Sequence, residues 1–338
     1  MSAEPRRRAH PGWHGHAFGL AIASSFPLVG FPSRDAPLHG DLAPIELAIA
    51  DERDLRAAFA HGSRPIGWRR GPDGTPRAPD LLSHAEEGYL MSEPAVGHFS
   101  ISSTGERILC APAGRIAWRW QRYLLGRVLP FATTLRGLEP WHAAAVSLRG
   151  GAIAIIGGPG LGKSTIAAEM VLAGARLLAD DVIALQSAAG AAIVHPGPPL
   201  LSLRTRPRSL FATSEIHRLG PRVGAEAGAL RLSVERAERP APLRAVYLLE
   251  RARREAPSRG DNGLTALPGP DPARLIGATF NFALRSADRL RRQLEVAAQL
   301  AGVPCVEARV APQADLRGLG RRILADARAR TDAAGARS

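Results

Sequence analysis

The fold of this 338-residue chain is decided by one stretch, Gly157-Gly158-Pro159-Gly160-Leu161-Gly162-Lys163-Ser164-Thr165. It matches G-x-x-x-x-G-K-[ST], a pattern whose glycines let successive backbone N–H groups curl around phosphates. The apolar run 152–156 before it predicts a buried strand, and the sequence from Lys163 to Ala173 predicts a helix, whose N-terminus favours anions. We therefore predict that these nine residues form a phosphate-binding loop.

Lys163 is the only lysine in a chain that has 44 lysines and arginines together. A slender ammonium can pass between backbone amides to reach the β and γ phosphates, whereas a broad guanidinium does not fit the same site. Ser164, the next residue, carries the hydroxyl that binds Mg²⁺ in this motif. We therefore predict that ATP and Mg²⁺ bind here, with Lys163 on the phosphates and Ser164 as a metal ligand.

Two adjacent aspartates, Asp180 and Asp181, follow the next apolar run, Leu177-Leu178-Ala179. The helix and the second strand bring the chain back to the glycine-rich loop. These carboxylates can therefore lie beside the γ phosphate. Because neighbouring residues of an extended chain point in opposite directions, the two should have different roles. One could accept the proton of an attacking hydroxyl while the other orients Mg²⁺ and its waters.

His142 lies just before the strand that leads into the loop. A histidine near the start of a strand is more often a hydrogen-bonded structural residue than a catalytic one. Its position next to the loop strand nevertheless makes it a candidate catalytic residue.

The net charge of +13 and the pI of about 11.2 raise the question of a nucleic-acid partner. The arginines are scattered among acidic residues, however, whereas a nucleic-acid surface usually shows a clustered stripe, so we do not expect a nucleic-acid partner. Cys110 and Cys305 do not have metal-ligand spacing and are expected to be buried reduced thiols.

The apolar stretch 17–31 is too broken by polar residues and proline to span a bilayer, so we expect a cytoplasmic protein without membrane contact.

The chain is expected to divide into two domains. Residues 1–12 and 326–338 are polar and are predicted to be disordered. Residues 13–139 predict a small, mainly β domain with a turn-rich stretch over 62–80 and a helix over Ile116–Leu129 at its end. Residues 140–325 alternate strand and helix patterns, which indicate an α/β domain with a parallel or mixed sheet. The topology of 187–240 stays open.

These features together resemble the HPr kinase/phosphorylase family, in which a histidine precedes the loop strand and a pattern like Gly-x-Arg-Leu-x-Ala-Asp-Asp ends the following helix and strand. The matching residues here are Gly174-Ala175-Arg176-Leu177-Leu178-Ala179-Asp180-Asp181. The stretch 136–142 also resembles the HPr-kinase-like proteins found beside enzymes of lasso-peptide biosynthesis. The resemblance is strongest over 141–185 and extends more weakly to about 310.

The resemblance implies an α/β fold, with a P-loop kinase domain of HPr-kinase type and a smaller, mainly β N-terminal domain. It implies that Asp180 is the general base toward an acceptor serine, that Asp181 supports metal and phosphate, and that His142 and Lys163 belong to the catalytic set. Bifunctional members carry a glycine-rich segment with a metal-binding glutamate where this chain has 198–204, Pro-Pro-Leu-Leu-Ser-Leu-Arg. The resemblance therefore implies kinase activity, whereas this departure speaks against phosphorolysis and recognition of HPr, and whether phosphorolysis occurs stays open.

The predicted function is ATP-dependent transfer of the γ-phosphoryl group to a hydroxyl, with a serine of a peptide or small protein as the expected acceptor. One alternative is a small-metabolite P-loop kinase, although such kinases usually space their aspartates Asp-x-Asp in a more compact chain. A second alternative is an ATP-sensing regulator without catalysis. The identity of the acceptor, the role of the N-terminal domain and the formation of a homo-oligomer stay open.

Overall fold

The computed structural model describes residues 12–32, 43–70, 76–204, 210–226, 228–252, 263–269, 275, 277–280, 283–311 and 313–335. The chain forms two compact units, Met1–Arg136 and Gly137–Ser338. The division falls close to the end of the predicted N-terminal domain at residue 139. Of the predicted disordered ends, residues 1–11 and 336–338 lie outside the described residues.

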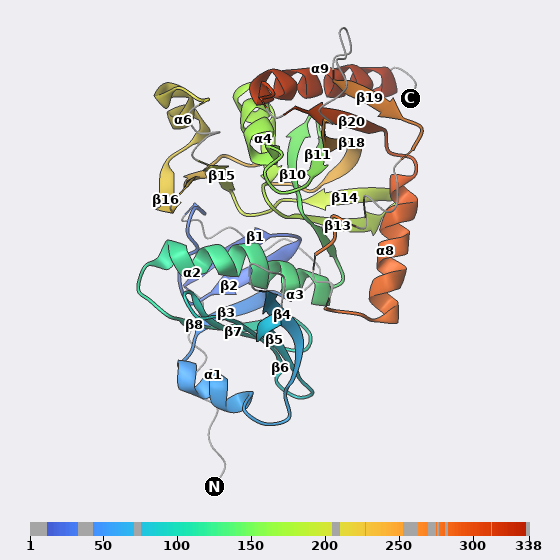
Figure 1. Ribbon diagram of the computed structural model, residues 1–338. Coiled ribbons are helices and arrows are strands. Elements are labelled where there is room, and N and C mark those ends of the chain that lie inside the picture. The colour runs from blue at the N-terminus through green and yellow to red at the C-terminus, as the bar shows by residue number, and fades with distance from the viewer. Residues whose placement is uncertain are drawn as a thin grey trace. The chain divides into compact units, whose positions relative to one another are not determined.

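The first unit is built on one sheet with the strand order β1-β2-β3-β8-β7-β6-β5-β4 (Figure 1). A short helix, α1, packs against β7 and β8, and three consecutive helical segments follow the last strand. The elements are β1 Trp13–Ala17, β2 Leu20–Ser24, β3 Ile45–Ile49, α1 Glu52–Ala58, β4 Arg64–Arg70, β5 Pro76–His84, β6 Gly88–Glu93, β7 Gly97–Ile101, β8 Arg107–Pro112, α2 Ala117–Tyr123, the π-helical η1 Leu124–Val128 and α3 Leu129–Leu135.

The predicted turn-rich stretch over 62–80 is wrong, because β4 and β5 occupy most of it as an antiparallel pair. β4 is the edge strand of the sheet, where a proline such as Pro65 can be accommodated, and the pairing shifts register around Gly67. The predicted helix over Ile116–Leu129 is present but continues through a π-helical turn to Leu135.

The second unit contains a mixed sheet in the order β12-β10-β11-β18-β14-β13-β9; β20 also pairs with β18, and β19 pairs with β20. A separate small sheet has the order β15-β17-β16. The elements are β9 Glu139–Trp141, β10 Ala143–Leu148, β11 Gly151–Gly157, α4 Lys163–Leu172, β12 Arg176–Ala179, β13 Ile183–Ala188, β14 Ala191–His195, β15 Leu200–Arg204, α6 Thr213–Leu219, β16 Arg222–Glu226, β17 Ala229–Ser233, β18 Ala241–Arg251, β19 Leu264–Leu267, α8 Ala287–Leu300, β20 Cys305–Val310 and α9 Leu316–Gly335.

Helices cover the two faces of this mixed sheet, giving an α/β fold (Figure 1). The side chains of β11 alternate between two cores, so that Ile153 and Ile155 pack with α4 and α9 while Ala154 and Ile156 pack with α8. β11 and β18 run parallel and β10 is antiparallel to β11, which confirms the predicted mixed sheet. The α/β character predicted for this half is therefore confirmed.

The predicted disorder over 326–338 is wrong as far as Gly335, because α9 continues through this segment. An apolar stripe of α9 begins before this segment with Leu319 and Ile323 and continues into it with Ala327, and all three are buried against the α4 side of the sheet. The Arg328 guanidinium also donates to the carbonyl of Ala173 at the end of α4. Packing against α4 therefore orders this part of the chain.

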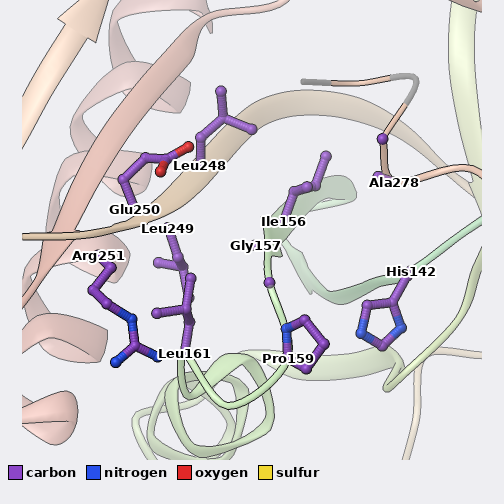
Figure 2. Close-up of a pocket in the computed structure, with 12 residues that line it drawn as sticks. His142, Ile156, Gly157, Pro159, Leu161, Leu248, Leu249, Glu250, Arg251 and Ala278 are labelled. Carbon is purple, nitrogen blue, oxygen red and sulfur yellow. The ribbon is translucent and has the colours of Figure 1, made fainter. Parts of the chain in front are cut away.

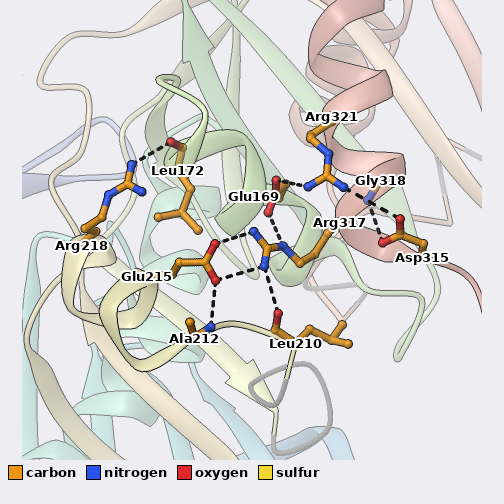
Figure 3. Close-up of polar contacts among 10 residues, drawn as sticks. All are labelled: Glu169, Leu172, Leu210, Ala212, Glu215, Arg218, Asp315, Arg317, Gly318 and Arg321. Atoms are coloured by element: carbon orange, nitrogen blue, oxygen red, sulfur yellow. Dashed lines mark hydrogen bonds and ion pairs between the residues drawn. The ribbon is translucent and has the colours of Figure 1, made fainter.

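Arg317 of α9 joins three helices of the second unit (Figure 3). Its guanidinium lies 2.7 Å from the buried Glu169 carboxylate on α4 and 2.6 Å from Glu215 on α6. Arg321, one turn later, reaches the other oxygen of Glu169 at 2.7 Å. Because α4 starts in the glycine-rich stretch, this network fixes α6 and α9 relative to that loop.

Arg289 of α8 forms a buried ion pair with Glu139 of β9, and both side chains are at most 5% exposed. The same guanidinium donates to the backbone carbonyls of Phe280 and Leu284. In turn, the backbone N–H of His142 donates to the carbonyl of Ala278 at 2.6 Å. Arg289 thus anchors Phe280 and Leu284, and Ala278, two residues before Phe280, contacts His142.

We expect Arg289→Met to lower the free energy of unfolding by about 3–5 kcal/mol, because Glu139 would then be a buried charge without its main partner. Arg291→Met is the matched control on the same helix, since Arg291 forms an exposed pair with Asp288 and should change stability by less than about 1 kcal/mol. Urea unfolding of both variants measures the difference. Equal stability of the two variants would contradict the anchoring role.

The described residues contain no helix that is both long and apolar enough to cross a membrane. Cys110 and Cys305 are buried and free, as predicted.

Candidate active site

The glycine-rich loop, residues 157–165, connects the end of β11 to the start of α4. Gly160 and Gly162 have φ angles of +80° and +92°, which side-chain-bearing residues rarely adopt. A Cβ on Gly162 would lie 2.7 Å from the Leu316 side chain of α9, and a Cβ on Gly157 would lie 2.8 Å from that of Leu249. The loop geometry therefore requires glycine at these positions.

The remaining loop residues divide into an exposed and a buried group. Gly158 and Pro159 are exposed at the start of the loop, whereas Leu161 and Thr165 are buried in the core beside α4. Ser164 is half-buried at the start of α4. The exposed first half of the loop is thus accessible to a ligand, and the second half anchors the loop in the fold.

Lys163 is the first residue of α4 and its side chain is largely buried. Its ammonium donates to the carbonyl of Gly157 at 2.8 Å and lies 3.0 Å from Nε2 of His142. Burial lowers the pKa of Lys163, the carboxylates of Asp181 and Asp180 oppose that shift, and Arg204 adds to it. The amine is held at the start of the loop by neutral acceptors that a phosphate could replace.

Asp180 is buried and Asp181 is exposed, but both follow the end of β12 at Ala179, so the difference does not come from alternation along a strand. Asp180 is 9% exposed and both of its oxygens are occupied. Oδ1 accepts from Ser164 Oγ at 2.8 Å, and Oδ2 accepts from the backbone N–H of Ser202 at 2.9 Å. Burial, followed by the charge of Asp181, raises the pKa of Asp180 to about 6, although both hydrogen bonds act against the shift.

This pKa predicts that Asp180 makes stability depend on pH. Its pKa in the unfolded chain is about 3.9, so the folded state holds the proton more tightly and loses stability as pH rises from about 4 to about 6. We expect Asp180→Asn to be more stable than the wild type at pH 7 by about 2–3 kcal/mol and equally stable near pH 3.5. Urea unfolding across this range, in a metal-chelating buffer, tests it. A constant difference between the two proteins would contradict the expectation.

β12 ends at Ala179, and Asp181, two residues later, has a left-handed φ angle of +72°. The carboxylate is 60% exposed and lies 3.5 Å from Nδ1 of His142. Because the Lys163 ammonium can only donate, Nε2 of His142 accepts and Nδ1 carries the proton that faces Asp181. The structure thus brings Lys163, His142 and Asp181 into one chain of contacts, and Asp180 with Ser164 into a second.

Arg204 of β15 and Arg231 of β17 are charged residues of this region that the sequence analysis missed. Strand pairing places Arg231 opposite Ser202, the residue whose N–H holds Asp180. The charge of Arg231 lowers the pKa of Asp180, and that of Arg204 lowers the pKa of Lys163. Both therefore add positive potential beside the loop. The alternation of leucine with polar residues in 201–204 and 230–232 is the pattern that could have indicated these strands.

The Ser164 hydroxyl and the Asp180 carboxylate are oxygen ligands that suit a magnesium ion which a phosphate also binds. Within the described ranges, no group of three or more His, Cys, Asp or Glu side chains gathers as it does in an all-protein metal site. Mg²⁺ prefers oxygen ligands and usually combines one or two protein oxygens with phosphate oxygens and waters. One hydroxyl and one carboxylate, 2.8 Å apart, fit that role.

No protein-family model and no curated protein matches this chain. Among solved structures, one described as the Hpr(Ser) kinase/phosphatase from Coxiella burnetii is similar with a TM-score of 0.32 and 14% identity. The match covers 58% of this chain and 94% of that chain. At that TM-score the likeness fixes neither the fold nor the activity of this protein.

Proposed function

We propose that this protein transfers the γ-phosphoryl group of ATP to a hydroxyl, with a serine of a peptide or small protein as the acceptor. The observation that carries the proposal is the row of contacts from Lys163 through His142 to Asp181, where a cation for the phosphates lies next to a carboxylate that can take a proton. The glycine-rich sequence and its position between a strand and a helix support ATP as the donor.

The loop residues would hold the nucleotide. Backbone N–H groups of 158–164 and the N-terminus of α4 would face the phosphates, and Lys163 would exchange its contacts with Gly157 and His142 for phosphate oxygens. Arg204 and Arg231, whose charges act on Lys163 and Asp180, would add positive potential near the phosphates. This exchange costs little, because the amine is already desolvated in the site.

Ser164 and Asp180 would hold the magnesium ion that accompanies ATP. When bound, such an ion neutralises charge on the β and γ phosphates. This assignment exchanges the roles that the sequence resemblance implied for the two aspartates, since Asp180 is buried against Ser164 and Asp181 is exposed. A carboxylate with both oxygens occupied is poorly placed to reach an incoming hydroxyl.

Asp181 would act as the general base. The acceptor oxygen forms a bond to the γ phosphorus, the bond from that phosphorus to the β–γ bridging oxygen breaks, and ADP leaves. The hydroxyl proton passes to the Asp181 carboxylate. His142 would orient that carboxylate through Nδ1–H, while Lys163 stabilises the charge of the transferring group.

The proposal is tested by incubating the purified chain with Mg-ATP and, separately, with a mixture of serine and threonine peptides and a mixture of sugars and polyols. Phosphorylated peptide, located by mass spectrometry, is the expected result. Phosphorylated sugar or polyol alone would support the small-metabolite kinase. Tight binding of Mg-ATP without any transfer would support the regulator.

A further inference from the structure

A cavity of about 410 Å³ lies where β11 and β18 end, beside the first residues of the glycine-rich loop (Figure 2). His142 and Pro159 line one side of it. The lining also includes Gly157 and Gly158, which precede the buried part of the loop, and Leu161. All of these residues belong to the second unit.

The position of Lys163 indicates which end of a bound nucleotide this cavity would meet. In this motif the lysine reaches the β and γ phosphates. The Lys163 ammonium contacts Gly157 and His142, and both of these line the cavity. Ser164 and Thr165, which follow Lys163 on α4, do not line it. With Lys163 on the β and γ phosphates as proposed above, the cavity would lie at the phosphate end of the nucleotide and not at the nucleoside.

The base proposed for the reaction lies at the same place. His142 forms part of the cavity wall, and its Nδ1 is 3.5 Å from the Asp181 carboxylate. A group that fills the cavity would lie against His142, which contacts both Lys163 and the Asp181 carboxylate. This is the position of an acceptor substrate.

The walls of the cavity are largely apolar, with five aliphatic side chains: Ile156, Leu161, Leu248, Leu249 and Ala278. The charged residues Glu250 and Arg251 also belong to the lining, and their side chains extend away from each other at the end of β18 (Figure 2). The carbonyl of Ala278 is already bound by the N–H of His142. A sugar would leave several hydroxyls without partners against these leucines, which is costly.

We propose that this cavity is the acceptor pocket and that it selects a hydroxyl-bearing residue flanked by an aliphatic or aromatic side chain. The proposal rests on the transfer reaction proposed above. It identifies the substrate class as a peptide segment in which a serine adjoins an apolar residue. The cavity is at the lower end of the range of about 300–1,000 Å³ typical of ligand pockets, which suits one or two side chains.

The test compares synthetic peptides that contain one serine in an otherwise constant sequence, with leucine, phenylalanine, serine or aspartate as its neighbour. We expect kcat/KM for the leucine peptide to exceed that for the aspartate peptide by at least about 10-fold. Ala278→Leu, which fills the cavity, should lower kcat/KM for the leucine peptide about 10–100-fold. The Kd of Mg-ATP should stay within about twofold of the wild-type value.

Ala237→Leu is the matched control, because Ala237 is similarly buried in the same core without lining the cavity. Leu248→Ala, which enlarges the cavity, should shift the preference toward phenylalanine and provides a second test where Ala278→Leu does not fold.

Equal kcat/KM for all four peptides, with transfer intact, would overturn the pocket assignment alone. Weaker Mg-ATP binding in Ala278→Leu with an unchanged peptide preference would assign the cavity to the nucleoside. Failure of the wild type to transfer phosphate to any hydroxyl would overturn the proposed function as well.

Discussion

Asp181→Asn is expected to lower the rate of phosphoryl transfer by about 10²–10⁴-fold while the Kd of Mg-ATP stays within about twofold. The reason is geometric. Asp181 is the exposed carboxylate that faces His142, whereas Asp180 is buried with both oxygens hydrogen-bonded. An amide of the same shape keeps the contact with His142 but cannot accept the proton of the acceptor.

Single-turnover measurements with a phosphorylated peptide as product give this rate directly. Asp288→Asn, at an exposed position on α8, is the control for loss of one negative charge. Asp180→Asn should behave differently from Asp181→Asn, since its main effect is expected on the concentration of Mg²⁺ that the reaction needs. Full transfer by Asp181→Asn would show that another group takes the proton.

Lys163→Ala is expected to weaken Mg-ATP binding by about 10²-fold and to abolish measurable transfer. A charge-assisted hydrogen bond to a buried group contributes about 1.5–3 kcal/mol, and loss of a donor to the transition state typically costs a further 10²–10³ in rate. Lys163→Arg keeps the charge and is expected to fail nearly as completely. Its planar guanidinium is too broad for the space between Gly157 and His142.

The uniqueness of this lysine provides an independent readout of binding. Lys163 is the only lysine of the chain, so an amine-reactive reagent can modify only this side chain and the N-terminal amine. We expect Mg-ATP to protect Lys163 and not the N-terminus, as measured by peptide mass spectrometry. Unchanged modification of Lys163 at saturating Mg-ATP would contradict its contact with the phosphates.

The site could be predicted from the sequence where its residues lie close together in the chain. The loop over 157–165, the two aspartates and His142 are local motifs. Different surroundings for Asp180 and Asp181 were expected from strand alternation, but β12 ends at Ala179 and a bend separates the two side chains. Which aspartate points inward could not be predicted. That depends on the left-handed φ of Asp181 and on the Ser202 N–H, which comes from the distant strand β15.

The same limit applies to the fold. The buried strand β11 and the helix α4 follow from an apolar run and a helical pattern, and both were predicted. The helical order of 326–335 was missed, because it depends on packing against α4 and not on local composition. The cavity beside the loop combines His142, Leu248 and Ala278, which are far apart in the sequence. The pairing of β10, β11 and β18 brings the first two together, and the hydrogen bond from the His142 N–H to the Ala278 carbonyl adds the third.

The most direct test of the central claim is to incubate the wild-type chain and Asp181→Asn with γ-labelled ATP, Mg²⁺ and the serine–leucine peptide. Mass spectrometry then locates the label. We predict a phosphoserine in the wild-type reaction, and at least 100-fold less of it with Asp181→Asn at equal nucleotide occupancy. Binding of Mg-ATP by the wild type without labelled peptide, or equal labelling by the two proteins, would contradict it.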